Sequence, residues 1–443
     1  MSDLRHFVLT SPLVDTHEHM ILQQAYLEQR PDILQMLFDG YAQADLFVAG
    51  APLAATEALV NAASPDVYAR FAAVYDAWRH CQFTSYGEVV RLNAQLNFGI
   101  DELTPESLQA AQERLPARTP TDRLRLLRDV ARLDHVQIDP IDSFPAPDPG
   151  GPDFFLYDIN LRQFVIAAMT PAFVARQTGV EVHGLGDLRR ALGAYFDRFA
   201  ALAIGVKSQH AYCRTLRWQP RTDAAAESVL QKWLRGEHPA EIPADGRPTD
   251  VLTEGERLCL GDWCCARIAE LCAEHDLPFR IHTGYHAGHS GMPLEWVHPE
   301  HLCPLLKAYP QTRFVLMHTG YPFGGELLAL AKHYRNVYVD LCWAWAIDTH
   351  ATSDFVRRCL RTVPANKLFA FGGDTWQPIL TIGYALQARR ALLRVLETEV
   401  ADGYLRTPDA LAIAQAWMRD NQYACFNVTQ KRAAAAAGSA VSP

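Results

Sequence analysis

The carboxyl half of the chain alternates between short apolar runs and longer segments with apolar residues at helical spacing. The short runs are the predicted strands, at 277–281, 313–317, 337–341 and 368–371. The longer segments are the predicted helices, at 255–275, 299–308, 324–334 and 353–361. Strands separated by helices indicate βαβ units and a parallel sheet. The strands are apolar almost throughout, as expected when both faces of a sheet are covered.

The amino half is less regular, but it provides the remaining strands of the same pattern. These predicted strands lie at 12–14, 135–138, 157–161 and 203–207. Eight strands predict an α/β fold of the (β/α)₈ TIM-barrel type, a single domain over residues 1–443. Residues 22–130 have mostly helical spacing, so we predict a large helical insertion after strand 1 that caps the mouth of the barrel. The Ala/Gly/Ser-rich tail from 433 to 443 is predicted to be frayed.

Composition and charge narrow the classes of function. Of the 443 residues, 49% are hydrophobic and 21% are charged, and the formal net charge is -9. The chain has no block of Lys or Arg, so a nucleic-acid partner is not expected. We find no signal peptide and no apolar stretch of membrane-spanning length, and the ten cysteines include no CxxC pair. These features predict a cytoplasmic protein with reduced cysteines.

Histidines and one carboxylate follow separate predicted strands. His17 and His19 follow strand 1, His282 follows strand 5, His318 follows strand 6, and Asp374 follows strand 8. Barrel enzymes place their chemistry at the carboxyl ends of the strands. An isolated HxH pair is weak evidence for a metal site, because a single His after a strand is more often a hydrogen-bonded core residue. The whole ordered set is specific enough to predict a metal site.

The residue types suit a divalent cation. Alternation along a strand points His17 and His19 to the same side, where two neutral imidazoles can chelate one ion. The Asp374 carboxylate can join them and accept a proton from a bound water. Such an ion lowers the pKa of its water from about 15.7 toward about 7. This chemistry predicts a hydrolase that needs no covalent intermediate.

The order of these residues resembles that of the amidohydrolase superfamily. Within it, the chain resembles the amidohydrolase-2 group, in particular the amidohydrolase-like domain of nodulin/glutamine-synthetase-like proteins. The insertion at 22–130 has no counterpart that we can name. The segments that carry the resemblance are 278–284 (PFRIHTG), 318–323 (HTGYPF), 334–340 (YRNVYVD), 372–374 (GGD) and 421–426 (NQYACF).

The resemblance implies a role for each matching residue. His17, His19, His282 and Asp374 match metal ligands, and Asp374 also matches the base that takes a proton from water. His318 matches either a second ligand or an acid/base that polarises the substrate. The implied cofactor is a divalent metal, Zn²⁺ in the first place and Mn²⁺ in the second. One ion is favoured, and two are possible if Lys207 is carbamylated.

Four further residues are candidates for substrate binding. Lys207 ends the predicted fourth strand, where it can be carbamylated, can bind a substrate carboxylate as a free ammonium, or can extend from the barrel rim as a solvated side chain. Arg214 has a planar fork that suits a carboxylate, but a structural ion pair is an equal alternative. Tyr285 lies in the Gly- and His-rich loop after strand 5. Trp376 follows strand 8, where it either lines an apolar pocket or packs in the core.

The leading hypothesis is therefore hydrolysis of an amide or ester of a small, carboxylate-bearing substrate. Nonoxidative decarboxylases of the amidohydrolase-2 group have a similar ligand set, so decarboxylation is the alternative. Sugar-acid isomerases are more distant relatives. A third hypothesis is a metal-stabilised barrel without catalytic activity. The expected partner is a small-molecule substrate, and a homo-oligomer is expected from base rates alone.

Overall fold

The computed structural model describes residues 3–140, 145–238, 251–288 and 291–439. Its strands pair in parallel, in the order β1-β2-β3 and β4-β5-β6-β7-β8-β9. The bounds are β1 Leu13–Glu18, β2 Leu133–Ile138, β3 Phe155–Tyr157, β4 Ile159–Asn160, β5 Val206–Ser208, β6 Phe279–Ile281, β7 Phe314–Met317, β8 Val337–Asp340 and β9 Leu368–Phe369. The predicted parallel sheet is confirmed.

Two sets of backbone hydrogen bonds join these strands into a barrel. β3 and β4 are separated only by Asp158, whose N–H donates to Ile138 at 2.8 Å, while the next N–H donates to Gly205 at 2.9 Å. They therefore form one barrel strand that links both sets. On the opposite side, Thr16 donates to the Phe371 carbonyl at 3.1 Å, and Asp374 donates to the His17 carbonyl at 2.8 Å. The described residues thus form the eight-stranded (β/α)₈ barrel that the sequence predicts.

The strand boundaries differ from the predicted ones in the amino half. β1 continues to Glu18, which pairs with Ile138, so His17 lies inside the strand rather than after it. The third strand begins two residues earlier than predicted, and the fourth begins later. Polar residues inside β1 obscured its true length, because they are buried around the site instead of exposed to water. The prediction that the tail is frayed from residue 433 is also wrong, because the chain is helical up to Ser439, where α23 ends.

Helix α1 (Asp3–Thr10) precedes the first strand, and helices α2 to α10 follow it in the chain. The large insertion after β1 contains α2 Gln23–Glu28, α3 Ile33–Phe38, α4 Ala42–Val48, α5 Leu53–Leu59, α6 Val67–Ala72, α7 Tyr75–Cys81, α8 Ser85–Phe98, α9 Pro105–Gln112, α10 Asp122–Leu124 and η1 Arg125–Val130. Capping residues set some of these bounds. Thr84 caps the start of α8, which ends at Gly99 with a φ of 66°.

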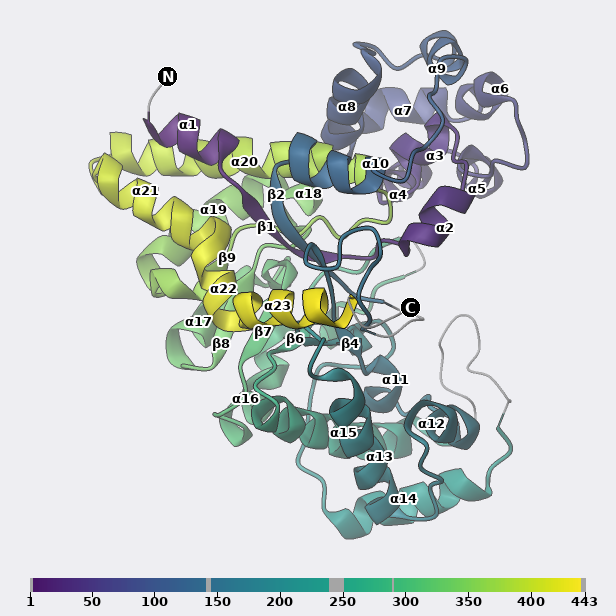
Figure 1. Ribbon diagram of the computed structural model, residues 1–443, viewed down its shortest axis with the longest axis vertical. Coiled ribbons are helices and arrows are strands. Elements are labelled where there is room, and N and C mark those ends of the chain that lie inside the picture. The colour runs from purple at the N-terminus through teal and green to yellow at the C-terminus, as the bar shows by residue number, and fades with distance from the viewer. Residues whose placement is uncertain (1–2, 141–144, 239–250, 289–290, 440–443) are drawn as a thin grey trace.

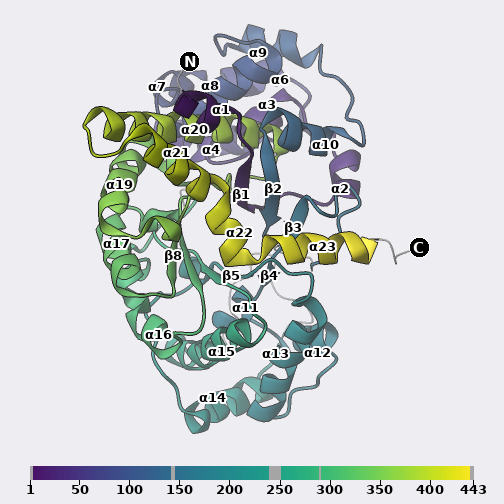
Figure 2. The ribbon, with the colours of Figure 1, turned by 60° about the vertical axis from the view of Figure 1, so that its left-hand side comes forward.

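The remaining helices follow β4 to β9 in the chain. Their bounds are α11 Arg162–Val165, α12 Pro171–Thr178, α13 Leu185–Phe199, η2 His210–Tyr212, α14 Asp223–Arg235, α15 Glu254–Glu274, η3 Leu294–Trp296, η4 Pro299–Leu302, α16 Cys303–Ala308, η5 His318–Gly320, α17 Gly324–His333, α18 Ala344–Ile347, α19 Thr349–Thr362, η6 Ala365–Lys367, α20 Pro378–Ala401, α21 Thr407–Gln415, η7 Ala416–Asp420, α22 Asn421–Phe426 and α23 Val428–Ser439. Figure 2 shows α15, α16, α17 and α19 as an arc outside the strands.

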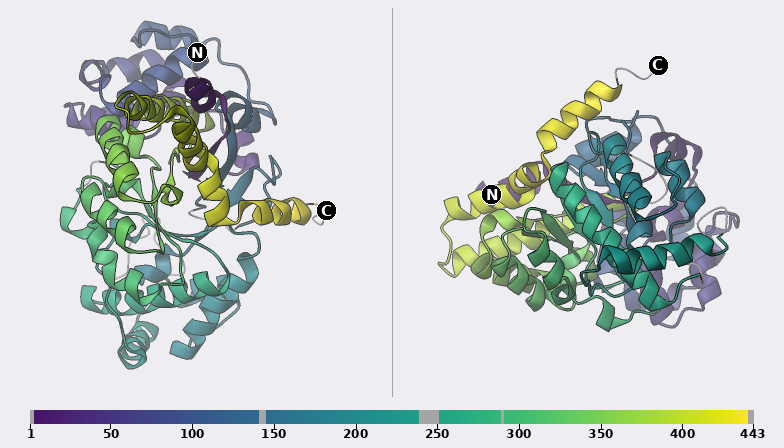
Figure 3. Two further views of the ribbon diagram at one scale, coloured as in Figure 1. Left: turned by 90° about the vertical axis from the view of Figure 1, so that its left-hand side faces the viewer. Right: turned by 90° about the horizontal axis from the view of Figure 1, so that it is seen from below.

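The insertion packs against α20 at one end of the molecule (Figure 1). The buried Asn93 of α8 joins the two: its amide donates to the Leu380 carbonyl at 3.1 Å and accepts from the Gly383 N–H at 2.9 Å. Helices α12 to α14 lie at the opposite end (Figure 3). The insertion is therefore attached to the helix that follows the last strand, next to Asp374.

A separate apolar cluster closes the amino end of the barrel. It brings Phe426 of α22 against Leu156, Val315 and Phe369, each the second residue of its strand. The Phe369 and Phe426 rings are 5.3 Å apart. Because this end is filled by side chains, the polar carboxyl end is the one left for chemistry.

Replacing Phe426 by Ala should lower the free energy of unfolding by about 3–5 kcal/mol, the usual cost of a cavity left by a buried aromatic ring. Phe426 is 0% exposed, and the matched control Phe83→Ala removes a ring that is 75% exposed. The control should change stability by no more than about 0.5 kcal/mol. Urea unfolding followed by circular dichroism measures both. Equal effects of the two variants would contradict the role given to this cluster.

Candidate metal centre

His17, His19 and Asp374 converge at the carboxyl end of the barrel. The Nε2 atoms of His17 and His19 each lie 3.2 Å from Oδ1 of Asp374. His318, which follows β7, places its Nε2 atom 4.0 Å from Oδ2 of the same carboxylate. Three segments distant in the chain thus direct nitrogen and oxygen atoms to one point.

Hydrogen bonds to backbone carbonyls orient two of these imidazoles. Nδ1 of His19 lies 3.3 Å from the Asp139 carbonyl, and Nδ1 of His318 lies 2.9 Å from the Cys342 carbonyl. A carbonyl oxygen only accepts, so each Nδ1 carries the proton and each Nε2 presents a lone pair. The buried Nε2 of His318 has no hydrogen-bond partner in the described part of the chain. Bare imidazole nitrogens around a carboxylate are the donor set of a divalent metal site, so these residues fit such an ion.

Asp374 is held in an unusual backbone conformation. Its φ is 57°, in the left-handed region, and His318 and Trp343 also have positive φ values in the loops after β7 and β8. Such strain is concentrated at functional sites. Two buried acids of β1 fasten the segment on both sides of Asp374: Asp15 accepts from the Gly373 N–H at 3.2 Å, and Glu18 accepts from the Thr375 N–H.

The protonation states agree with metal ligation, which requires neutral imidazoles and an ionised carboxylate. Burial lowers the pKa of His17 well below its usual value, and the nearby Lys207 ammonium lowers it further. Burial also lowers the pKa of His318, to about 4. Burial alone would raise the pKa of Asp374, but the facing His17 and His19 side chains outweigh it and hold this pKa well below its usual range.

Lys207 points into the centre. Its side chain is 1% exposed, which excludes the solvated position at the rim, and Nζ lies 3.0 Å from Nε2 of His17. Asp139, which the sequence reasoning missed, follows β2 and places Oδ2 3.8 Å from the same Nζ. His17, His19 and Asp139 together present ligand atoms within 4.8 Å of one another. Asp139 could have been found by the rule that found the histidines, since it is the first residue after its strand.

His282 lies beside this set, but its Nε2 atom is committed to a backbone carbonyl. Its ring is 4.4 Å from that of His318, and its Nε2 donates to the Tyr285 carbonyl at 2.8 Å. Among the described residues His282 belongs to neither cluster of metal-ligand atoms, which are His17, His19 and Asp139, and His318, Cys342 and Asp374. Its role as a ligand therefore stays a prediction. Tyr285 contributes its carbonyl to this contact, and its ring lies 5.8 Å from Trp343.

Arg214 is placed in the wall of the barrel, where it forms an ion pair. Its Nη2 donates to Asp262 at 2.6 Å and its Nη1 donates to the Val165 carbonyl at 3.2 Å. This is the structural alternative that the sequence left open. A different guanidinium, Arg162, lies at the site. It begins α11, two residues after the end of β4, and the sequence around it gave no periodic signal to mark it.

A cavity of about 380 Å³ lies over the centre. Trp376, which is 42% exposed, lines it with its ring 4.6 Å from that of His19. Tyr41 of the insertion also lines it, and its hydroxyl donates to the Asp374 carbonyl at 2.6 Å. The full lining is His17, His19, Tyr41, Arg162, Lys207, Gln209, Tyr212, Cys213, His282, His286, Ala287, Gly291, Asp374 and Trp376.

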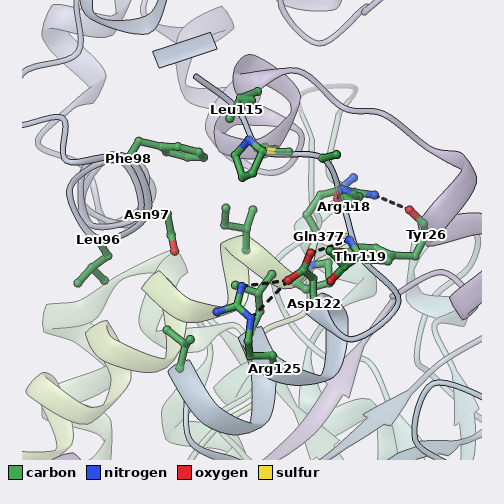
Figure 4. A pocket seen from close by; sticks show the side chains of 17 residues that line it. Tyr26, Leu96, Asn97, Phe98, Leu115, Arg118, Thr119, Asp122, Arg125 and Gln377 are labelled. Atoms are coloured by element: carbon green, nitrogen blue, oxygen red, sulfur yellow. Dashed lines mark hydrogen bonds and ion pairs between the residues drawn. The ribbon is translucent and has the colours of Figure 1, made fainter. Parts of the chain in front are cut away.

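A larger cavity, of about 470 Å³, lies between the insertion and the start of α20 (Figure 4). Its lining includes Arg118, Asp122 and Arg125, of which the last two form an exposed ion pair at 3.1 Å. No histidine lines it in the part of the chain that the structure describes. The cavity over Asp374, although smaller, is therefore the one that fits the predicted chemistry.

Comparisons with known proteins define the class. Residues 165–421, more than half of the chain, match the Amidohydrolase family. The chain therefore belongs to the amidohydrolase family, which implies a divalent metal. Protein fluG of Emericella nidulans is 24% identical over 456 residues that cover 99% of this chain and 48% of fluG. The chain thus spans about half the length of this curated relative.

The fold is shared with two crystal structures of sugar-acid isomerases. Glucuronate isomerase from Caulobacter crescentus has a TM-score of 0.74 and 17% identity, covering 96% of this chain and 93% of the isomerase. Uronate isomerase from Thermotoga maritima has a TM-score of 0.72 and 15% identity, covering 96% and 100%. At this identity the likeness concerns the fold alone. Across the described residues, every helix is too short or too polar to span a membrane.

The purified chain should contain a divalent metal that depends on His17 and His19. We expect His17→Asn and His19→Asn each to lose most of it, because an amide is a poor replacement for an imidazole ligand. The control His80→Asn changes an exposed histidine of α7. Inductively coupled plasma mass spectrometry of the dialysed proteins measures the content. Full metal occupancy in both ligand variants would exclude this centre.

Proposed function

We propose that this protein is a metal-dependent hydrolase that cleaves an amide or ester bond of a small, carboxylate-bearing substrate. One observation carries the proposal: Asp374 lies 3.2 Å from two imidazole Nε2 atoms beneath a cavity that Lys207 and Arg162 also line. His17, His19 and Asp374 would hold the ion, for which Zn²⁺ is our first choice and Mn²⁺ the second. When bound, the ion supplies Lewis acidity that polarises a carbonyl and acidifies water.

Asp374 is the group that moves the proton. Its low pKa keeps it ionised, so a carboxylate oxygen can accept a proton from the attacking water and return it to the leaving nitrogen or oxygen. His318 presents a bare Nε2 because Nδ1 is committed to the Cys342 carbonyl. In this tautomer it serves as a second ligand or a base and does not donate a hydrogen bond to the substrate carbonyl.

Lys207 and Arg162 give the cavity its preference for an anion. Lys207 of β5 is buried beside His17. Arg162 begins α11, which follows the neighbouring strand β4. An ammonium or guanidinium that is shielded from water binds a carboxylate more strongly than an exposed one does. Carbamylation of Lys207 would instead make it a bridge between two ions. We favour one ion and a free ammonium.

Decarboxylation remains the second candidate, since it would use the same imidazole and carboxylate set. Similarity in fold to uronate isomerases makes a sugar acid the third substrate to test. The products separate the three reactions. Hydrolysis releases an amine or alcohol, decarboxylation releases carbon dioxide, and isomerisation conserves mass.

Hydrolysis should stop when the metal is removed and return when zinc or manganese is added. Asp374→Asn should lower kcat by about 10²–10⁴-fold, the usual contribution of a general base. The control Asp354→Asn changes an exposed carboxylate of α19 and should keep full activity. Liquid chromatography of N-acyl amino acids and carboxylic esters measures the products, and metal content is determined in parallel. Carbon dioxide release without an amine or alcohol would overturn hydrolysis.

Lys207→Met should weaken binding of substrates that carry a carboxylate. Loss of one charge-assisted hydrogen bond, about 1.5–3 kcal/mol, should raise KM by about 10–100-fold. The same substrate with its carboxylate capped as a primary amide should change much less. Lys232→Met, which removes an ammonium that is 46% exposed, is the control. An equal loss on charged and capped substrates would show that Lys207 does not anchor the carboxylate.

A further inference from the structure

Two cavities meet at Asp374. The cavity over the metal centre, of about 380 Å³, adjoins a second cavity of about 320 Å³. Both are lined by Tyr41, Ala287, Asp374 and Trp376. A molecule whose reacting bond lies at Asp374 therefore has room on both sides of that bond.

The second cavity, which we call the annex, differs in chemistry from the first. The insertion provides Gly40, Tyr41 and Ala44, and α20 provides Leu380 and Tyr384. In the described part of the chain its only charged side chains are Asp39 and Asp374, and both are acidic. The annex thus disfavours an anion, while Lys207 and Arg162 favour one in the first cavity. The anionic end of a substrate is therefore expected in the first cavity and its uncharged end in the annex.

We propose that the annex binds an aromatic group, so that the substrate joins a carboxylate-bearing fragment to an aromatic fragment through the bond at Asp374. The position of the bond rests on the proposed function, but the binding preference of the annex does not. An apolar cavity of about 150 Å³ holds benzene, so the annex has room for one ring. The walls formed by Tyr41, Tyr384 and Trp376 suit an aromatic ring, which packs well against other rings.

The insertion is thereby a determinant of specificity. Tyr41 is fixed by its hydrogen bond to the Asp374 carbonyl and by its ring, 4.4 Å from Trp343. These contacts hold Gly40 and Ala44 of the adjoining chain segment at the edge of the reacting centre. The family match begins at residue 165, so this wall lies outside the matched segment.

Gly40 offers a direct way to fill the annex. A Cβ atom at this position would lie 3.6 Å from Cδ1 of Leu380, an ordinary contact, and the φ of Gly40 lies outside the left-handed region. Gly40→Leu should therefore occupy the annex without backbone strain. Ala44→Leu fills the same space from α4 as a second variant. Ala54→Leu, on the exposed side of α5 in the same insertion, is the matched control.

Binding without turnover tests the annex itself. The probe is 4-phenylbutanoate, which has the spacing between carboxylate and ring of N-benzoylglycine but no bond to hydrolyse, and butanoate lacks the ring. In the zinc-loaded full chain, calorimetry should show the phenyl compound binding at least about tenfold more tightly, an expected gain for one buried ring. This ratio should fall below about threefold in Gly40→Leu or Ala44→Leu and persist in Ala54→Leu.

The outcomes separate the two proposals. A ratio near one in the wild type, or a ratio that both filling variants leave unchanged, overturns the aromatic annex. Turnover of N-benzoylglycine against N-acetylglycine forms a separate arm. If the ring ratio appears in binding and neither compound is hydrolysed, the annex stands and hydrolysis of such amides fails.

Discussion

The geometry of the site depends on how β1 holds the segment around Asp374. His17 lies in β1, His19 directly follows it, and the ligand carboxylate comes from the segment after β9. The two segments must therefore be aligned closely enough to form hydrogen bonds. The Asp374 N–H donates to the His17 carbonyl at 2.8 Å, while Asp15 and Glu18 accept from the N–H groups on either side. The hydrogen bonds that close the barrel between β1 and the segment after β9 thus also position the ligands of the metal centre.

The charge balance beneath the centre also favours a cation. Burial raises the pKa of Asp15 to about 7, and raises those of Asp158 and Asp340 to about 6. Arg280 of β6 donates to Asp158 at 2.8 Å and to the Thr16 carbonyl. Its positive charge offsets part of the negative charge of these buried carboxylates. The ammonium of Lys207 offsets another part of this negative charge. A divalent ion at Asp374 would stabilise the remaining buried carboxylates, because opposite charges interact strongly where water is excluded.

The barrel and the core of its centre could be predicted because both follow from local patterns. Apolar runs of strand length mark β6 to β9. His318 directly follows β7, and Asp374 lies in the short segment after β9. β1 was predicted too short because its buried polar residues break the apolar pattern. The aromatic and small residues of the annex come from the insertion, whose position over the barrel is set by packing against α20. The sequence could not show that Arg214 is structural and that Arg162 lies at the site. That assignment depends on Asp262 of α15, which pairs with Arg214 only in the folded chain.

The central claim is that imidazoles and a carboxylate, without sulfur, bind one ion. X-ray absorption spectroscopy of the zinc-loaded protein tests it directly, because Zn–N and Zn–O distances are about 2.0–2.2 Å and Zn–S distances about 2.3 Å. Cys342 is the informative neighbour, since its thiol lies within 4.8 Å of ligand atoms of His318 and Asp374. Burial raises the pKa of this thiol well above its usual value, so we expect no sulfur ligand. A shell of nitrogen and oxygen with imidazole scattering is the predicted result, and a sulfur shell or a spectrum without imidazole would contradict the account.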